Sequence, residues 1–442
     1  MVALPRSADQ VRQVLLTCSR LKVPLVARGS GTGLSGGATP HAEGVLLSCA
    51  RMSRVLEIDP LNRTARLEAG VPNLKVSEAA AAHGLYYAPD PSSQVACSIG
   101  GNVAENSGGV HCLKYGLTVH NVLGLRGYTV DGEPIELGGR APDGPGLDLL
   151  GAFIGSEGTL GIVTKIVVKL TPVPEAVHLV LAAYSSLEAG GRAVTDIIGA
   201  GIVPAAIEMM DALSIEAAEA AVHCNYPEGA GAVLLVELDG PVAEVEEELA
   251  TVRALCAAAG ATEIRAADDP VQRAGIWAGR KSAFAAVGRL SPAYIVQDGV
   301  VPRTALGDVL ARISALSAEA GIRVANVFHA GDGNLHPLVL YDDASVAETE
   351  AAEVLSGAIL DTCIEYGGSI TGEHGVGVDK SRYMPKMFSA DDLDTMQLVR
   401  CAFDPASLCN PGKVFPTPRL CGEVPGPRRG PHPATASGAE IF

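Results

Sequence analysis

The sequence predicts an α+β protein with two domains, and three observations support this prediction. The 442 residues are 48% apolar, which is sufficient to bury more than one hydrophobic core. Glycines are concentrated in residues 29–37, 100–109 and 155–161, a density typical of loops whose backbone approaches a ligand closely. From residue 176 onward, the succession of strand and helix patterns favours a sheet with helices on one face.

The composition excludes several functional classes. A net charge of −17 argues against a nucleic-acid partner and against an anionic membrane surface. None of the ten cysteines belongs to a CxxC pair, so neither zinc ribbons nor ferredoxin-type clusters are expected within this chain. There is no apolar run of the ~20 residues that span a bilayer and no signal pattern. We expect a soluble cytoplasmic protein with reduced thiols, peripheral to the inner face of the membrane only through its partners.

The chain opens with a predicted β-α-β unit. Val2–Leu4 and Val23–Ala27 are the expected strands, and the helix between them begins at the capping box Ser7-x-x-Gln10. The second strand leads into Arg28–Gly37, within which residues 31–36 match GxGxxG.

This glycine loop does not predict a Rossmann site. Such a site needs a helix that opens at the third glycine, whereas Gly37-Ala38-Thr39-Pro40 follows here and cannot propagate a helix. A glycine loop without a helix can still bind a pyrophosphate through a concave row of backbone N–H groups.

The rest of the first domain continues with strands, a helix and a second glycine-rich run. We expect strands at 45–48, 65–68, 122–130, 134–137 and 162–170 and a helix at 74–82. Between them lies Cys97–Gly109, whose small hydroxyl and amide side chains suit close approach by a ligand. Thr171-Pro172-Val173-Pro174 ends this part, and we place the domain boundary there.

The second domain is predicted to alternate strands with helices. Strands are expected at 177–183, 232–238 and 262–265, and helices at 188–199, from 211, and at 241–258. Residues 204–208 lie between the first two helices, and no element is assigned to them. The capping box Ser345-x-x-Glu348 opens a further helix that Gly367 ends. Beyond about residue 422 the chain is rich in Pro, Gly, Ala and charge, and we expect it to be poorly ordered.

Two histidines flank a predicted hairpin loop. Residues 324–328 and 337–340 are apolar, and Gly331–Asn334 between them is typical turn chemistry. This loop would place His329 directly opposite His336, with Cβ atoms roughly 4.5–5.5 Å apart. Such a pair suits a zinc-like ion about 2.0–2.1 Å from each imidazole nitrogen.

A second segment, Gly372-Glu373-His374-Gly375, supplies a carboxylate and a further imidazole. We therefore predict a metal site formed by His329, His336 and Glu373, with His374 beside it as a base. The alternative is a cross-strand histidine pair without a ligand.

The combination of motifs resembles a known family. Arg28–Gly37, Pro89–Gly109, Gly155–Thr164 and Asn410–Lys413 resemble the FAD-binding framework of the vanillyl-alcohol-oxidase (PCMH-type) flavoproteins. The pair His329 and His336 with Glu373-His374 resembles the metal and active-site signature of their D-2-hydroxyacid dehydrogenase branch. Within that branch, segments 279–289, 298–299 and 418–426 are most similar to the FAD-linked subunits of glycolate oxidases.

The resemblance implies a two-subdomain PCMH-type FAD-binding domain over residues 1–172. It implies an α+β cap domain with an antiparallel sheet over 173–403, which carries the substrate and the metal, and a C-terminal segment, 404–442, that returns to the FAD domain. Members of the family usually carry a further segment ahead of the position that matches Leu4, so we expect a truncated or reannotated start.

The resemblance also implies FAD as the cofactor. No histidine occurs in residues 28–37, the usual place of a covalent link, so FAD is expected to bind non-covalently. The expected FAD-binding residues are Arg28, Gly29, Ser30, Gly31, Thr32, Gly33, Leu34, Ser35, Pro91, Ser98, Gly101, Asn102, Ser107, Gly108, Gly158, Ile162, Val163 and Asn410.

The reaction that the resemblance implies is the metal-assisted oxidation of a small 2-hydroxy acid, glycolate or also D-lactate, to glyoxylate or pyruvate. Arg280 would clamp the substrate carboxylate, because guanidinium geometry matches a carboxylate, with Lys281 beside it. His374 would contact the substrate and take the hydroxyl proton as general base. The divalent metal is left open among Zn, Mn and Fe, since all three accept N₂O ligation.

Electrons would then pass to partner subunits, namely a second FAD-binding-like chain and an iron–sulfur chain of a glycolate oxidase complex, and on to the quinone pool. Three alternatives are weighed against this function. They are a D-lactate or D-2-hydroxyglutarate dehydrogenase, a non-catalytic FAD-binding electron-transfer subunit, and a zinc hydrolase.

Overall fold

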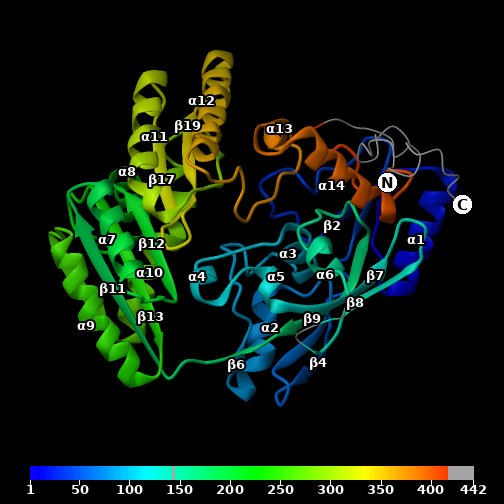
Figure 1. The fold of residues 1–442 in the computed structure, drawn as a ribbon, viewed down its shortest axis with the longest axis horizontal. Coiled ribbons are helices and arrows are strands. Elements are labelled where there is room, and N and C mark those ends of the chain that lie inside the picture. The colour runs from blue at the N-terminus through cyan, green and yellow to red at the C-terminus, as the bar shows by residue number, and fades with distance from the viewer. Residues whose placement is uncertain (142–143, 145, 417–442) are drawn as a thin grey trace, which may run out of the picture.

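The computed structural model describes residues 1–141, 144 and 146–416. The tail predicted to be poorly ordered and the 418–426 motif lie outside the described residues. Figure 1 shows two parts side by side, a blue-to-cyan part that carries the N-terminus and a green-to-yellow part. Among the described helices, none is both long and apolar enough to cross a membrane.

The first part begins with the predicted β-α-β unit. Strand β1 (Val2–Ala3), helix α1 (Ala8–Leu21) and strand β2 (Leu25–Arg28) follow one another, and β3 (Val45–Ser48) lies between the two strands in a parallel sheet. Ser7 caps α1 by accepting a hydrogen bond from the Gln10 N–H. No helix occurs in residues 29–44, all of which are described, which confirms that the glycine loop is not a Rossmann turn.

A five-stranded antiparallel sheet completes the first part. Its order is β4-β5-β9-β7-β8, and its strands are β4 (Val55–Asp59), β5 (Thr64–Glu68), β7 (Val122–Tyr128), β8 (Pro134–Gly138) and β9 (Ile162–Lys169). The predicted strands at 45–48 and 65–68 therefore belong to different sheets. A two-stranded ribbon, β6 (Leu85–Tyr86) with β10 (Thr171–Pro172), closes this part near the linker.

Short helices surround these sheets. They are α2 (Asn73–Ala80), η1 (Ala81–His83), α3 (Ile99–Glu105), α4 (Cys112–Tyr115), α5 (Thr118–Asn121) and α6 (Leu149–Phe153). The glycine-rich run at 97–109, for which no helix was predicted, thus contains α3. Ser98 caps it by accepting from the Gly101 N–H, and Ile99 and Val103 are buried, so capping and burial offset the low helix propensity of glycine.

The second part is built on a nine-stranded antiparallel sheet. The order is β14-β11-β13-β12-β17-β18-β16, and β19 pairs with both β17 and β15. The strands are β11 (Ala176–Tyr184), β12 (Ala206–Asp211), β13 (Ala232–Gly240), β14 (Glu263–Ala267), β15 (Ala293–Val296), β16 (Gly299–Val300), β17 (Val324–His329), β18 (Asn334–Leu335) and β19 (Pro337–Tyr341).

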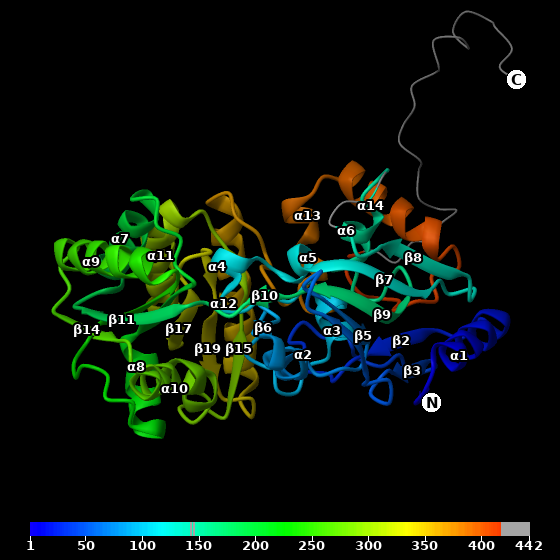
Figure 2. The same ribbon diagram turned by 90° about the horizontal axis from the view of Figure 1, so that it is seen from below.

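Helices cover both faces of this sheet, so the prediction of one covered face is wrong (Figure 2). Val180, Ala182 and Tyr184 of β11 face one core, while the alternate residues Leu179 and Leu181 face another. The run of apolar residues in β11 is continuous because both faces are buried. The helices of this part are α7 (Leu187–Gly199), α8 (Ala212–Val222), α9 (Val242–Ala258), α10 (Pro270–Val287), η2 (Arg303–Ala305), α11 (Leu306–Ala320) and α12 (Val346–Glu365).

The last described segment packs on the first part (Figure 1). It contains η3 (Ser381–Tyr383), α13 (Met384–Met387) and α14 (Ala390–Phe403). Phe403 meets Phe153 edge-on at a centroid distance of 6.0 Å, and the Asn410 N–H donates to the Leu25 carbonyl. The chain therefore already returns to the first part within α14. The domain limits at 172 and 403 stay a prediction.

Strand β13 carries the ion pairs that hold the two parts together. His111 of the first part lies between two carboxylates, with Nδ1 2.8 Å from Asp90 and Nε2 3.0 Å from Glu237. Two residues farther along the same face of β13, Asp239 pairs with Lys114 at 2.6 Å. Burial lowers the pKa of His111, but the two carboxylates outweigh it and raise that pKa well above its usual value.

Replacing His111 should destabilise the protein in a pH-dependent way. A raised folded-state pKa means that the contribution is complete below the unfolded histidine pKa and lost as pH rises through the folded one. We expect His111→Gln to lower the free energy of unfolding by about 1–3 kcal/mol at mildly acidic pH and by less at alkaline pH, measured by denaturant titration. The exposed His83→Gln is the control, and an equal loss at both pH values would contradict the ion-pair interpretation.

Candidate active site

A large cavity lies between the two parts of the molecule. Its volume is about 760 Å³, within the range of small-molecule and cofactor sites. The first part contributes the glycine loop after β2 and residues of α3 to its lining. The second part contributes residues of α10 and β15, together with His336, Glu373 and His374.

Most of the predicted FAD-binding residues line this cavity or a smaller one of about 60 Å³ that shares several of its lining residues. Arg28, Ile162 and Val163 line the smaller cavity. The large cavity is lined by Gly29, Ser30, Gly31, Thr32, Gly33, Leu34, Pro91, Ser98, Gly101, Asn102, Ser107, Gly108 and Gly158.

Ser35 and Asn410 line neither cavity and instead support the glycine loop from behind. The Ser35 carbonyl accepts from the N–H groups of Val378 and Asp379 at 3.0 and 3.2 Å. Asn410 Nδ2 donates to the carbonyls of Gly37 and Glu157 at 2.9 and 2.5 Å. Both residues therefore fix the shape of the loop without contacting the cavity.

The conformation of Gly31 requires glycine. Its φ is +73°, and an added Cβ would collide with the Arg28 guanidinium. A left-handed residue with a Cβ costs roughly 1–2 kcal/mol. The loop that lines the cavity therefore has a backbone path that other residues do not adopt readily.

The hairpin that carries the two histidines has a different register from the predicted one. His329 pairs with Asn334 rather than with His336, because the turn comprises residues 330–333 and Gly333 adopts φ +73°. The two imidazoles are consequently diagonal neighbours. A shift of two residues leaves both on the same face, and their ring centroids lie 5.1 Å apart.

Both histidines converge on Glu373. His329 Nε2 is 3.2 Å and His336 Nε2 is 3.0 Å from Glu373 Oε1. Burial raises the pKa of Glu373, but the two imidazoles outweigh it and hold that pKa well below its usual range. The structure thus brings together the three residues predicted as metal ligands.

The hydrogen bonds on the far side of each ring favour metal ligation. His329 Nδ1 lies 2.7 Å from Glu208 Oε1, and His336 Nδ1 lies 3.3 Å from the Gln297 carbonyl. Without an ion, both ring nitrogens of His329 face carboxylates, which raise its pKa well above the usual value despite burial. With an ion bound, each ring would keep its proton on Nδ1, against the outer acceptor, and present Nε2 to the ion. Two imidazole lone pairs and a carboxylate then meet at one point, with the outer acceptors that metal-binding histidines use. The donor set fits a divalent transition metal.

Asp298 organises this site and was not predicted as a site residue. Asp298 Oδ2 accepts from the N–H groups of Gly372 and His374 at 3.0 and 2.9 Å and from the Thr371 hydroxyl at 2.6 Å. Lys380 adds a buried ion pair at 3.2 Å. Burial raises the pKa of Asp298, but its electrostatic interactions with the His374 imidazole and the Lys380 ammonium hold that pKa well below its usual range.

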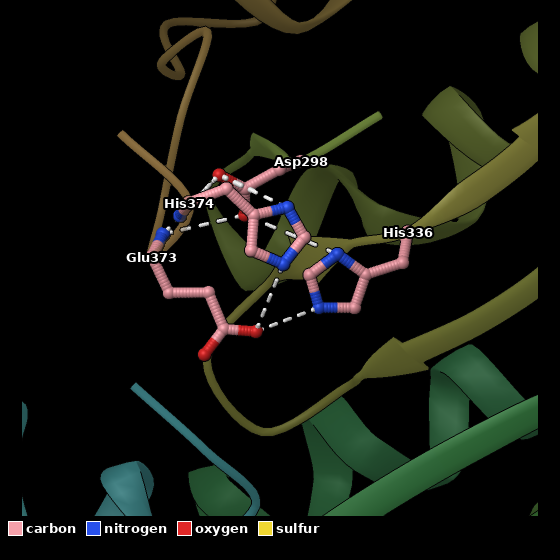
Figure 3. Close-up of side chains that lie close together, drawn as sticks. All are labelled: Asp298, His336, Glu373 and His374. Atoms are coloured by element: carbon pink, nitrogen blue, oxygen red, sulfur yellow. Dashed lines mark hydrogen bonds and ion pairs between the residues drawn. The ribbon is translucent and has the colours of Figure 1, made fainter. Parts of the chain in front are cut away.

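Asp298 also belongs to a second, overlapping group of possible ligands. Single atoms of Asp298, His336, Glu373 and His374 lie within 4.8 Å of one another (Figure 3). Because the oxygens of Asp298 already accept several hydrogen bonds, we assign it to holding the loop. In the sequence, the only available signal was an aspartate two residues after the apolar residues 293–296.

His374 lies at the edge of the cavity beside the cluster. Its ring stacks on that of His336 at 4.9 Å and an interplanar angle of 12° (Figure 3). Its Nε2 is 3.7 Å from Glu373 Oε1, and its side chain remains 17% exposed. Burial lowers the pKa of His374 to about 4, so the ring is neutral and able to accept a proton.

Arg280 is not placed where a substrate clamp is expected. Its side chain is 2% exposed and pairs with Glu208 at 2.6 Å, and it does not line the large cavity. The prediction that Arg280 grips a substrate carboxylate is therefore not supported by this arrangement. Lys281, the next residue, is exposed and lines the cavity.

Family models match nearly the whole chain. Residues 173–414 match the C-terminal domain of FAD-linked oxidases, and residues 1–138 match an FAD-binding domain. The chain belongs to the family of FAD-linked oxidases. FAD is therefore its cofactor, and the large cavity lined by the glycine loop fits that cofactor.

Individual relatives agree with this family. The chain is 54% identical over 423 residues to the glycolate oxidase subunit GlcD of Escherichia coli (strain K12), covering 96% of this chain and 85% of the relative. It is 33% identical to a D-lactate dehydrogenase of Anaerostipes hadrus, covering 92% and 88%. Among solved structures, p-cresol methylhydroxylase aligns with a TM-score of 0.77 at 16% identity, over 93% of this chain and 88% of that one. The predicted PCMH-type fold is confirmed.

Substitution of Gly31 should weaken FAD binding. The strain of a left-handed alanine, about 1–2 kcal/mol, and the collision with Arg28 predict roughly tenfold weaker binding for Gly31→Ala. Fluorescence titration of apoprotein with FAD measures this change. Gly84→Ala is a matched control, because Gly84 also has φ +65° but an added Cβ there meets no atom within 4 Å. Equal FAD affinity in Gly31→Ala and the parent would contradict the assignment.

Proposed function

We propose that this protein oxidises a small 2-hydroxy acid with FAD, and that glycolate is the preferred substrate and D-lactate a second one. One observation carries the proposal: the cluster of His336, Glu373 and His374 lines the same cavity as the glycine loop. The names of the relatives, a glycolate oxidase subunit and a D-lactate dehydrogenase, support the substrate class.

Lys281 is the group that we assign to the substrate carboxylate. It lies on α10 and lines the cavity, and an ammonium attracts a carboxylate where water is partly excluded. Phe284, one turn later on the same helix, lines the cavity and packs against the His336 ring at 5.9 Å. It provides an apolar wall that limits the acid to a small size.

His329, His336 and Glu373 would hold the divalent metal, and the fit of their donor atoms supports this assignment. Bound there, the ion supplies Lewis acidity that lowers the pKa of the substrate hydroxyl and orients it. The backbone of Gly372–His374, fixed by Asp298, keeps Glu373 in place.

His374 is the proposed general base. Its neutral ring takes the hydroxyl proton at Nε2, the nitrogen nearest to Glu373. Asp298 lies 3.9 Å from Nδ1, on the other side of the ring, and stabilises the charge that His374 gains. FAD supplies the acceptor for the two electrons of the α C–H bond, so the product is the 2-oxo acid.

Electrons leave through partner subunits in this proposal. The relative from Escherichia coli is named a subunit, and this chain has no CxxC pair among its ten cysteines. We propose a second FAD-binding-like chain and an iron–sulfur chain as partners, with quinone as the final acceptor. A non-catalytic electron-transfer subunit would not need His374, and a hydrolase would not need FAD.

Anaerobic mixing of the FAD-loaded protein with candidate acids tests the proposal. We expect glycolate to bleach the visible flavin absorbance fastest and D-lactate more slowly, whereas acetate, which lacks the hydroxyl, leaves it unchanged. Faster bleaching by D-lactate or D-2-hydroxyglutarate would show that this acid, rather than glycolate, is the preferred substrate. If dithionite bleaches the flavin and none of the acids does, the chain is not a 2-hydroxy acid dehydrogenase.

Removal of the proposed base should abolish turnover and spare the cofactor. His374→Ala is expected to lower kcat with glycolate by about 10²–10⁴-fold, the usual contribution of a general base, because no other neutral imidazole is assigned to the substrate. FAD absorbance should stay at the parent level. The control is His83→Ala, a substitution at an exposed position on η1. Parent-like turnover of His374→Ala would show that His374 is not the general base.

A further inference from the structure

A buried polar chain extends from the metal cluster away from the cavity. His329 Nδ1 contacts Glu208 Oε1 at 2.7 Å, and Glu208 Oε2 contacts Arg280 at 2.8 Å to Nε and 2.6 Å to Nη2. The side chains of these three residues are 5%, 1% and 2% exposed. Each oxygen of Glu208 therefore has its own charged or polar partner.

The backbone fixes this chain of contacts. Glu208 of β12 is paired directly opposite His329 of β17, so their side chains stand next to each other on one face of the sheet. Helix α10 covers that face and supplies Arg280. Each link thus lies on a regular element rather than on a loop, which suits the exact placement of a side chain.

The folding of β12 does not explain Glu208. The residue stands among Ala206, Ile207, Met209 and Met210, all buried. Replacing a buried ion pair by apolar side chains of similar volume is often neutral or stabilising. Glu208 lies between the Arg280 guanidinium and the His329 imidazole. This arrangement therefore indicates that Glu208 acts on the His329 imidazole.

We propose that Glu208 and Arg280 are positioning residues for His329. Glu208 accepts the Nδ1–H of His329, which sets the tautomer and turns the Nε2 lone pair toward Glu373. Arg280 Nε donates to Glu208 Oε2, and Nη2 lies 2.6 Å from the same oxygen as an ion pair, so the guanidinium fixes the direction of the carboxylate. This inference rests on the metal site of the proposed function, and it gives Arg280 a role other than contact with the substrate.

The sheet contains a matched control for this inference. Glu237 on the neighbouring strand β13 is a largely buried carboxylate, with its side chain 12% exposed. It likewise contacts an imidazole, His111, and a residue of α10, Trp277, at 3.0 and 2.6 Å. Neither partner is a proposed metal ligand. A change of Glu237 therefore tests for general effects of altering a buried carboxylate in this sheet.

The test measures metal affinity directly. FAD-loaded protein is stripped with a chelator and titrated with Zn²⁺ and with Mn²⁺ by calorimetry, and flavin absorbance and thermal unfolding are recorded for every variant. We expect Glu208→Gln and Glu208→Asp to weaken metal binding by about 10–100-fold. Glu237→Gln should bind metal like the parent. Parent-like affinity in both Glu208 variants would overturn the inference.

Arg280 is tested by separating metal affinity from substrate affinity. Arg280→Lys should weaken metal binding less than Arg280→Met, because a lysine retains one donor to Glu208. A higher KM for glycolate with unchanged metal affinity would instead place Arg280 at the substrate and overturn its positioning role. If the stripped parent binds neither ion, the proposed metal site itself fails, and this inference fails with it.

Discussion

The site depends on the burial of one carboxylate, that of Asp298. Its side chain is inaccessible to solvent, and it can remain charged there only because N–H groups and the Lys380 ammonium surround it. Those N–H groups belong to Gly372–His374, so the same hydrogen bonds that stabilise Asp298 hold Glu373 and His374 toward the hairpin histidines. These hydrogen bonds fix the backbone of residues 372–374 within the site.

The features that the sequence predicted well are local ones. The capped helix α1, the glycine loop without a helix, and the approach of His329 to His336 follow from turn residues and apolar runs that lie close together in the chain. Glu373, which is 44 residues beyond His329, was instead indicated by its position beside His374 between glycines. The hairpin register was wrong by two residues because Gly333, not Asn334, ends the turn. A slip by an even number keeps the same face, so the imidazoles of His329 and His336 still lie next to each other.

The features that the sequence did not predict are pairings between distant segments. Arg280 has the right chemistry for a carboxylate, but which carboxylate it meets depends on how α10 packs over β12. The roles of Glu208 and Asp298 likewise depend on partners that lie far from them in the sequence. The sequence also did not show that helices cover both faces of the large sheet. A strand that is apolar throughout has no alternation of polar and apolar residues that would distinguish an exposed face from a buried one.

The position of the cavity explains why the two parts must be held in register. Gly108 of the FAD-binding part lies so close to Glu373 that an added Cβ would stand 2.5 Å from its Oε2. The glycine loops of the FAD-binding part and the cluster of His336, Glu373 and His374 thus line one cavity, and a small displacement of one part would change the distance between them. The ion pairs of His111 and Asp239 along β13 resist that displacement, and they act at the strand next to the one that carries Glu208.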